Sequence, residues 1–441
     1  MKHAVVFPTF KKGPNVNHDD VRSYGPMSNL STLSKILERF VCSQLVGFLD
    51  KNALFPEQQS VYRKNHSTVT AVLKVMSDIL LTFDEGRLIL LTSLDMSSAF
   101  DTVDHATLLS RLYHTFGFDK CVLSWFSSYL SSRSQSVSAH HVMSKSIPIT
   151  CGVPQGSVLG PILFLLYTAN IPAIVTNCGL SIHLYADDVL IYGSCKPAEC
   201  DLLSKRISDC IDHVSEWLKS NNLLLNEQKT NVMWCSSNRR SHQIPDFPVR
   251  IGSVYVNPVS VIKFLGIYVD CHLTMKKHVS NTVSSCFSML RQIRSIRRCV
   301  SRPLLINLIS SLVFSRLDYS CSSLIGQTSI TFRRLQSVIN ASARVAYSRR
   351  MTDSISPLLR DLHWLKFRFV WTFGCVNWFI VVLMVQLHLI SPHSCKKWKM
   401  AAYTPHQASS LQSVASRGRL LEVVLFQWPE LACGTAYLIM Y

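Results

Sequence analysis

The chain has 441 residues, of which 48% are hydrophobic and only 16% are charged. This composition excludes a disordered protein and leaves room for a large core or several subdomains. Lys and Arg outnumber Asp and Glu by 45 to 27, and the formal net charge of +18 favours a polyanionic partner, nucleic acid before membrane.

Fifteen cysteines are scattered without a CxxC pair or a Cys/His spacing typical of zinc sites. Residues 1–12 are short and mixed and lack the pattern of a signal peptide. We therefore expect reduced, mostly packed cysteines and an intracellular protein of the nucleus or cytoplasm.

The N-terminal part predicts helices after a polar start. Residues 1–24 are rich in turn formers and have no clear period. Ser31 can cap a helix, and Ser67 can start a second one. The apolar residues of the first helix recur at helical spacing: Leu33, Ile36, Leu37, Phe40, Val41 and Leu45.

A continuous apolar run at residues 88–94 has the length of a buried strand and ends at Asp95. A turn and a helix are expected over residues 99–116. A carboxylate after a buried strand is an exposed acid on a rigid element, which suits a functional site. The alternative is a helix N-cap, a role that Asp101 or Asp104 could fill equally well.

Residues 183–192 (HLYADDVLIY) place two adjacent acids, Asp187 and Asp188, between strand-like apolar residues. The pattern predicts a hairpin with both acids at its tip. Two like charges in an apolar setting are costly unless a cation compensates them, and Mg²⁺ prefers carboxylates together with substrate phosphates. A solvated turn is the alternative.

The remaining elements follow in order. Residues 125–130 are expected to be helical, residues 131–146 to form a hairpin-like stretch, and residues 158–170 to form a long apolar helix after the glycine-rich residues 151–157. Further on we expect a helix at residues 198–219, a strand at residues 232–235, and a strand pair at residues 261–270 hinged at Gly266. These strands and helices predict an α+β fold.

Residues 276–350 carry thirteen basic residues and one acid, Asp318, so they supply +12 of the net charge. Arg291, Arg294 and Arg298 are expected on one helical face. A solvated helix usually mixes both signs, and this segment therefore favours a surface that follows a nucleic-acid backbone.

One acid after a strand and two at a hairpin tip are what two-metal phosphoryl transfer requires. In these residues and in the motifs around them, the chain resembles the reverse transcriptase domain of non-LTR, LINE-type retrotransposons of the Jockey and CR1-like kind. The similarity covers about residues 20–365, and its motifs follow the family order. They are residues 25–30 (GPMSNL), 59–68 (QSVYRKNHST), 93–103 (SLDMSSAFDTV), 152–161 (GVPQGSVLGP), 185–188 (YADD), 226–230 (NEQKT) and 264–267 (FLGI).

The resemblance implies a right-hand polymerase with fingers, a palm built on an antiparallel sheet, and a helical thumb. It implies an RNA-directed DNA polymerase that extends a primer 3′-hydroxyl on an RNA template with deoxynucleoside triphosphates. Two Mg²⁺ ions, with Mn²⁺ as an alternative, would be held by Asp95, Asp187 and Asp188. We expect a remnant at residues 1–24, fingers and palm at residues 25–270, a basic thumb at residues 271–365 and a divergent tail at residues 366–441.

Other roles follow from the same resemblance. Phe100 would lie under the incoming sugar, or else be a core residue of the next helix, and Gln155 and Gly156 would line the nucleotide pocket. Lys229 would protonate or steady the pyrophosphate, or else be a solvated lysine beside a turn. The primer and template would contact Gly266, Arg291, Arg294 and Arg298.

Departures from the family pattern open alternatives. Gly25 stands where the family usually has an arginine that contacts the triphosphate, so this cation is missing unless Arg22, Arg63 or Lys64 substitutes for it. The alternative function is therefore a catalytically lapsed remnant that still binds nucleic acid. The residues before the first motif are too few for an endonuclease, and we expect another protein to nick the target. The apolar residues 369–390 are long enough to span a membrane, but a changed reading frame is favoured over an anchor.

Overall fold

The computed structural model describes residues 2–10, 19–20, 23–97, 99–139, 142–319, 321–324 and 326–372. These residues fall within one compact unit, Met1–Ile380. The predicted tail and the apolar residues 369–390 lie outside the described part from residue 373 on, and so does Arg22. The mixture of sheets and helices confirms the predicted α+β class.

Four antiparallel strands in the order β11-β3-β9-β8 form the palm sheet. They are β3 (Leu88–Leu94), β8 (Ser181–Tyr185), β9 (Asp188–Cys195) and β11 (Asn231–Cys235). Successive side chains of β3 enter opposite cores: Leu90 belongs to one hydrophobic cluster and Leu91 to the other. Because both faces are covered, the strand reads as an unbroken apolar run.

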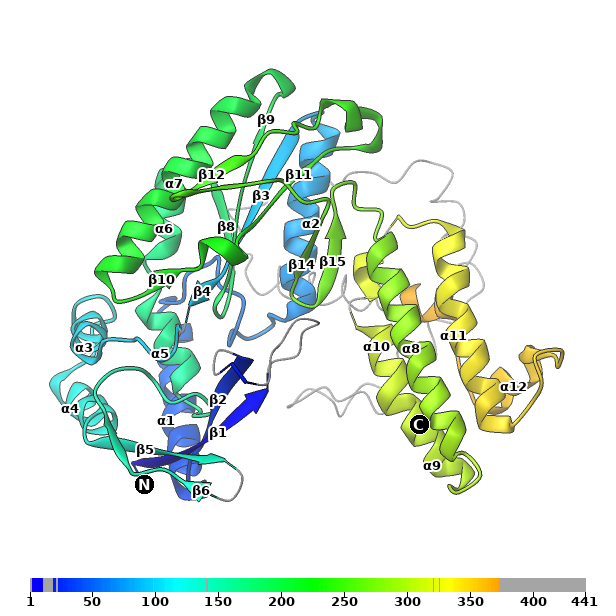
Figure 1. Ribbon diagram of the computed structural model, residues 1–441, viewed down its shortest axis with the longest axis horizontal. Helices are drawn as coiled ribbons and strands as arrows, with labels where there is room; N and C mark the ends of the chain where they lie inside the picture. Colours follow the sequence, from blue (N-terminus) through cyan, green and yellow to red (C-terminus); the bar gives the residue numbers. More distant parts are fainter. Residues whose placement is uncertain are drawn as a thin grey trace. The chain divides into compact units, whose positions relative to one another are not determined.

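Helices lie on both faces of the palm sheet (Figure 1). Helices α6 (Ile171–Asn177) and α7 (Cys200–Ser220) cover one face, together with α5 (Gly160–Tyr167) in the same core. Helix α2 (Thr68–Asp84), capped by Ser67 as predicted, covers the other face. The long helix expected at residues 158–170 is instead α5 followed by a turn and α6, since Pro172 at the start of α6 cannot donate a helical hydrogen bond.

A second sheet, the fingers sheet, has the order β2-β1-β5-β6, with β7 also paired to β5. Its strands are β1 (His3–Phe10), β2 (Tyr24–Asn29), β5 (Arg133–Ala139), β6 (Val142–Met143) and β7 (Ile147–Ile149). The nearby helices are α1 (Thr32–Lys51), α3 (His105–His114) and α4 (Lys120–Leu130). Strand β1 has no counterpart in the sequence prediction, because only Ala4 and Val6 of it are buried and no alternation results.

Helix α1 begins after Ser31, whose hydroxyl accepts a hydrogen bond from the Ser34 amide, as predicted. Its apolar residues are arranged unexpectedly. Of the predicted apolar set only Leu45 is buried, whereas Leu33 and Phe40 are 64% and 68% exposed. The first half of the helix instead turns Ser34 and Glu38 inward.

Short paired strands and the thumb helices complete the described chain. The pairs are β4 (Met96–Ser97) with β10 (Leu224–Leu225), β12 (Val249–Ile251) with β13 (Val254–Val256), and β14 (Val261–Phe264) with β15 (Ile267–Asp270). The thumb helices are α8 (Lys276–Ile296), α9 (Arg302–Ile309), α10 (Ser315–Asp318), α11 (Ser329–Tyr347) and α12 (Ile355–Asp361), with a π-helical turn, η5 (Ser310–Phe314), between α9 and α10. Short 3₁₀ helices are η2 (Pro197–Glu199), η3 (Glu227–Lys229), η4 (Asn238–Gln243) and η6 (Cys321–Leu324).

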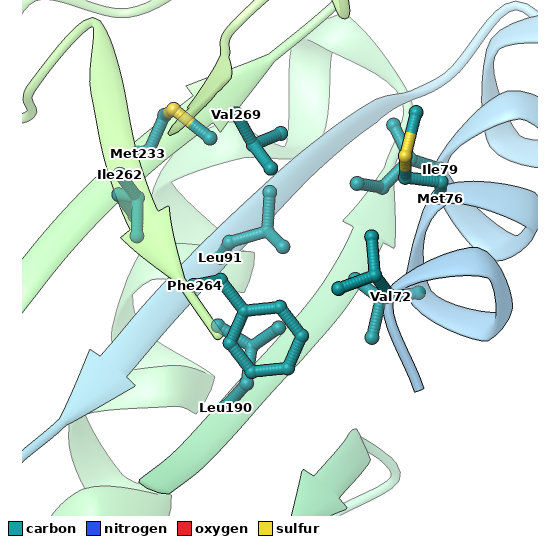
Figure 2. A pocket seen from close by; sticks show the side chains of 10 residues that line it. Val72, Met76, Ile79, Leu91, Leu190, Met233, Ile262, Phe264 and Val269 are labelled. Atoms are coloured by element: carbon teal, nitrogen blue, oxygen red, sulfur yellow. The ribbon is translucent and has the colours of Figure 1, made fainter. Parts of the chain in front are cut away.

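A small cavity lies between α2, the palm sheet and the β14–β15 pair (Figure 2). Its volume is about 20 Å³, and all ten lining side chains are apolar, with Phe264 and Leu190 among them. A space of this size holds at most about one water molecule, and a dry apolar lining offers that water no partner. We regard it as a packing defect of the core and not as a substrate site.

Within the described part, the stretch Gly160–Asn177 has the length and hydropathy of a membrane span. However, 61% of it is buried inside the protein, where α5 and α6 form part of the palm core. A buried core helix meets the same criteria as a membrane span, which makes this weak evidence for membrane insertion.

Candidate functional site

Strand pairing brings the three predicted acids together. The antiparallel register of β3 and β9 pairs Leu94 with Val189, so Asp95 follows β3 directly opposite Asp188, and Asp187 lies in the adjoining turn. Burial raises the pKa of Asp188, and the negative charges of Asp187 and Asp95 raise it further. The three carboxylates therefore share one electrostatic environment although they come from two segments of the chain.

The donor chemistry suits a divalent cation, since carboxylate oxygens are the ligands that hard ions prefer. Among the described residues, no three His, Cys, Asp or Glu side chains already form a ready metal cage. Instead, the Lys229 ammonium lies 3.4 Å from Asp95 Oδ2, and both side chains are largely exposed. An exposed ion pair is weak, so a divalent ion can displace Lys229 at little cost. The acids thus fit a metal by type and register.

The tip of the acidic hairpin is held in a strained conformation. Ala186 has a φ of 55°, in the left-handed region that L-residues rarely adopt. Its amide donates to the side chain of Gln59, 3.3 Å away, which is itself 2% exposed. The Ser60 amide donates to the Leu184 carbonyl at 3.1 Å. A fingers segment therefore fixes the turn that presents Asp187.

The turn that carries Lys229 is attached to the first acid. Strand β10 pairs with β4, which follows Asp95, and the Asn226 amide donates to the Asp95 carbonyl at 2.8 Å. The 3₁₀ helix η3 then brings Lys229 to the Asp95 carboxylate. The two motifs are 130 residues apart in the chain yet adjacent in the fold.

The glycine-rich loop at residues 152–157 lies against the turn after β4. Gln155 Nε2 donates to both carboxylate oxygens of Asp101 at 3.0 and 3.1 Å, and the Val153 amide donates to the Phe100 carbonyl at 2.8 Å. Burial raises the pKa of Asp101, while the bond from Gln155 lowers it. Gly156, with a φ of +96°, lies against β2, where a Cβ would approach the Ser28 carbonyl to 2.6 Å.

Phe100 is half-buried, and its ring lies 4.8 Å from that of Phe164 in α5. It precedes α3, whose N-cap is Asp104, so it is not a residue of the following helix. Asp104 also fills the capping role considered for Asp95. The Phe100 backbone is therefore joined to the loop that carries Gln155, while its ring packs on α5.

Arg63, expected near the nucleotide, is engaged with its own loop. Its Nη1 donates to the carbonyls of Pro56, Glu57 and Gln59 at 3.1 to 3.3 Å. Gly25 lies in β2, paired with Thr9 of β1. The structure thus does not bring Arg63 and Gly25 together with the acids through any of these contacts.

The predicted primer contacts separate into two places. Gly266 has a φ of +81° between β14 and β15, as the predicted hinge requires, and Tyr319 of the thumb donates to the Leu265 carbonyl beside it at 2.6 Å. Arg291 and Arg294 are exposed on α8. Arg298 was expected on the same helical face, but α8 ends at Ile296 and Arg298 lies in the turn beyond it.

Sequence reasoning missed several residues around the site. Lys263 of β14 lowers the pKa of Asp188 through its positive charge, and Glu38 contacts the start of α5. Gln59 lay inside a quoted motif without a role, and Asp101 was considered only as a possible helix N-cap. Glu38 lies between two other charged residues of the same helix, Lys35 and Arg39, so the sequence contains no signal for its burial, and its partner Val158 is 120 residues away.

Comparison with known proteins adds to this geometry. The family model described as reverse transcriptase (RNA-dependent DNA polymerase) matches residues 11–269. A probable RNA-directed DNA polymerase from transposon BS of Drosophila melanogaster is 30% identical over 293 residues, covering 64% of this chain and 31% of that protein. The RNA-directed DNA polymerase from mobile element jockey of the same species is 29% identical, covering 59% and 28%.

Among solved structures, apo telomerase from Candida tropicalis aligns with a TM-score of 0.46 at 14% identity, covering 87% of this chain and 69% of that one. The chain spans about a third of the length of the curated relatives it matches. The predicted resemblance to LINE-type elements is confirmed by the family model and the transposon relatives.

Proposed function

We propose that this chain, which belongs to the reverse transcriptase (RNA-dependent DNA polymerase) family, extends a DNA primer on an RNA template. The observation that carries the proposal is the strand register that places Asp95 opposite Asp188, with Asp187 adjacent. Three interacting carboxylates at one sheet edge supply a concentrated negative site for cations and for the phosphates that accompany them.

Divalent metal ions are general to this family, and we assign them here to two Mg²⁺ ions held by Asp95, Asp187 and Asp188. Such ions would activate the primer 3′-hydroxyl and neutralise the leaving pyrophosphate. The chain's own residues do the rest. Gln59 holds the hairpin tip, and η3 keeps Lys229 within reach of Asp95. The Lys229 ammonium, beside Asp95 in an exposed ion pair, would steady or protonate the pyrophosphate.

The incoming nucleotide would lie between Phe100 and the loop of Gln155 and Gly156. Phe100 packs on Phe164, so its ring is fixed and can act as a floor under the sugar. Gln155 is oriented by Asp101, and the missing side chain at Gly156 lets the loop pack against the Ser28 carbonyl of β2. These three residues come from two loops joined by backbone hydrogen bonds, which supports a preformed nucleotide pocket.

The primer and template would run from the Gly266 turn to the basic thumb. Tyr319 fixes this turn, since its hydroxyl donates to the Leu265 carbonyl and its ring lies 3.3 Å from the position that a Cβ of Gly266 would take. Arg291 and Arg294 on α8 would contact phosphates, with Arg298 reaching from the turn that follows. Phosphate contacts carry no sequence information but set affinity and salt dependence.

Primer extension by the full chain tests the proposal. A labelled DNA primer is annealed to an RNA template and incubated with Mg²⁺ and all four deoxynucleoside triphosphates. We expect wild type to extend the primer and Asp187→Asn to lose at least about a thousandfold in rate, because a metal ligand is removed. Asp201→Asn, an exposed acid in the first turn of α7, is the matched control and should behave as wild type.

Two results would contradict the proposal. Equal extension by wild type and Asp187→Asn would exclude the acidic site as the catalytic centre. Binding of the primer–template without any extension by wild type would support instead a nucleic-acid-binding remnant.

A further inference from the structure

Over the first half of helix α1, polar side chains are buried and apolar side chains are exposed. The side chains of Ser34 and Glu38 point into the protein, and Glu38 is 1% exposed. Leu33 and Phe40, by contrast, face outward. A buried carboxylate is unfavourable by several kcal/mol unless hydrogen bonds compensate it, and this position therefore needs a specific partner.

The partner of Glu38 is the start of α5. Glu38 Oε2 accepts from the Val158 amide at 2.7 Å and from the Leu159 amide at 3.3 Å. Its Oε1 accepts from the Ser34 hydroxyl at 3.0 Å. The next amide, that of Gly160, donates to Ser157 Oγ at 2.9 Å. The amides that open α5 thus have partners, and a negative charge lies at the positive end of the helix, where it is most stable.

The local cap is Ser157, which binds the first amide of α5, that of Gly160. The side chains of Leu159, the N-cap, and of Val158 before it have no acceptor. The amides of these two residues are therefore held by a side chain 120 residues before Val158 in the sequence. Removing the carboxylate leaves the part-buried Val158 amide and the buried Leu159 amide without this partner.

The glycine-rich loop joins directly to this turn. The Ser28 amide donates to the backbone carbonyl of Gln155 at 3.1 Å, and Gly156 lies against the Ser28 carbonyl. The loop is therefore held at one end by β2 and at the other by Glu38. Both anchors belong to the fingers segment between residues 28 and 38.

We propose that Glu38 is a positioning residue that fixes the Gln155–Gly156 loop for the incoming nucleotide. The inference rests on the proposed function, since it assigns the loop to the nucleotide pocket. The Glu38 carboxylate also occupies the N-terminus of α5, so the triphosphate cannot bind there. The nucleotide phosphates must bind elsewhere, at the acids and Lys229.

Glu38→Gln tests this role. The amide side chain has nearly the same shape but carries no charge. Its oxygen can still accept from the Val158 and Leu159 amides while its NH2 donates to Ser34 Oγ, so the substitution removes the charge and weakens the two amide bonds. We expect the KM for deoxynucleoside triphosphates to rise about tenfold, as for the loss of one charge-assisted hydrogen bond, with kcat changed less and primer–template affinity unchanged. Ser34→Ala, which removes only the bond to Oε1, should raise this KM by about twofold to threefold. Glu216→Gln on the exposed face of α7 is the matched control.

A purely structural role would give a different result. Glu38→Gln would then lower the melting temperature and the active fraction while the KM of the remaining enzyme stayed at the wild-type value, and this outcome would overturn the proposal. If Glu38→Gln does not fold, the KM of Ser34→Ala for deoxynucleoside triphosphates tests the proposal instead.

Amide hydrogen exchange separates this inference from the proposed function. In Glu38→Gln the amides of Val158 and Leu159, and those of the loop at residues 152–157, should exchange faster than in Glu216→Gln. This comparison holds even if wild type extends no primer, a result that would count against the proposed function alone. Unchanged exchange at these amides would refute the positioning role.

Discussion

Protonation of His183 should destabilise the protein as the pH falls below neutrality. His183 lies in β8, two residues before the acidic hairpin tip, and is 5% exposed. Burial, and to a smaller extent the nearby positive charge of Lys74, lower its pKa from 6.5 to about 4. Its Nε2 lies 3.2 Å from Ser60 Oγ, in the segment that holds the hairpin. The neutral ring is therefore the form that fits the fold.

The sign and size follow from the two pKa values. Between about pH 6.5 and about pH 4 the unfolded chain binds a proton at His183 that the folded chain does not, so stability falls as the pH falls. Each unit of pKa difference corresponds to about 1.4 kcal/mol, which makes the full loss about 3 kcal/mol. Above pH 6.5 this contribution no longer changes.

Urea unfolding of wild type and His183→Gln at several pH values measures this loss. Other groups, Asp188 among them, titrate in both proteins, so the difference between the two curves isolates His183. The free-energy advantage of wild type over His183→Gln should shrink by about 3 kcal/mol between pH 7 and pH 4. A difference that stays constant over this range would refute the reasoning.

Three further predictions concern the loop, the lysine and the thumb. Gly156→Ala should lower the free energy of unfolding by about 2–3 kcal/mol, because its φ of +96° and the 2.6 Å approach to a backbone carbonyl exclude a Cβ. Gly47→Ala in helix α1, where a Cβ meets nothing within 4 Å, should stabilise by about 0.5–1 kcal/mol in the same melts, and equal effects would contradict the assignment. Lys229→Met should change the free energy of unfolding by less than about 1 kcal/mol, since its ion pair is exposed. It should nevertheless lower kcat about tenfold to a hundredfold in steady-state extension, with Lys219→Met as the control. An unchanged kcat would exclude Lys229 from the mechanism. Arg291→Ala combined with Arg294→Ala should reduce the salt-dependence slope of primer–template binding by about 2 in anisotropy titrations, whereas the exposed pair Lys205→Ala and Arg206→Ala on α7 should leave it unchanged.

The elements with strong local signals could be predicted from the sequence. The apolar run before Asp95, the hairpin around Asp187 and the caps at Ser31 and Ser67 all depend on neighbouring residues, and the structure confirms them. Local propensity and hydrophobic period are enough for such features.

Other features depend on tertiary contacts that no local pattern contains. Strand β1 is stabilised by pairing with β2 and β5, since its own burial pattern is too irregular to indicate a strand. Helix α1 has the predicted helical period, but over its first half the face that carries Glu38 is buried and the predicted apolar face is exposed. The reason is that Glu38 accepts a hydrogen bond from the Val158 amide, just before α5. The electrostatic interaction between Lys263 and Asp188 likewise joins segments far apart in the chain.

The site shows the same division. The motifs identify Asp95, Asp187 and Asp188, and the strand register brings them together. The motifs do not indicate that Lys229 pairs with Asp95 or that Arg63 is bound to its own loop carbonyls. These contacts arise from side-chain geometry after folding, which spacing alone does not encode.

We propose that the acids that follow β3 and lie at the β8–β9 turn carry out templated nucleotide addition. Single-nucleotide incorporation measures this activity, with a primer on RNA templates that differ only in the next base and with each deoxynucleoside triphosphate offered alone. Wild type should add only the complementary nucleotide, EDTA should stop the reaction and Mg²⁺ should restore it, and Asp95→Asn should be inactive. Addition that ignores the template base, survives EDTA or persists in Asp95→Asn would contradict it.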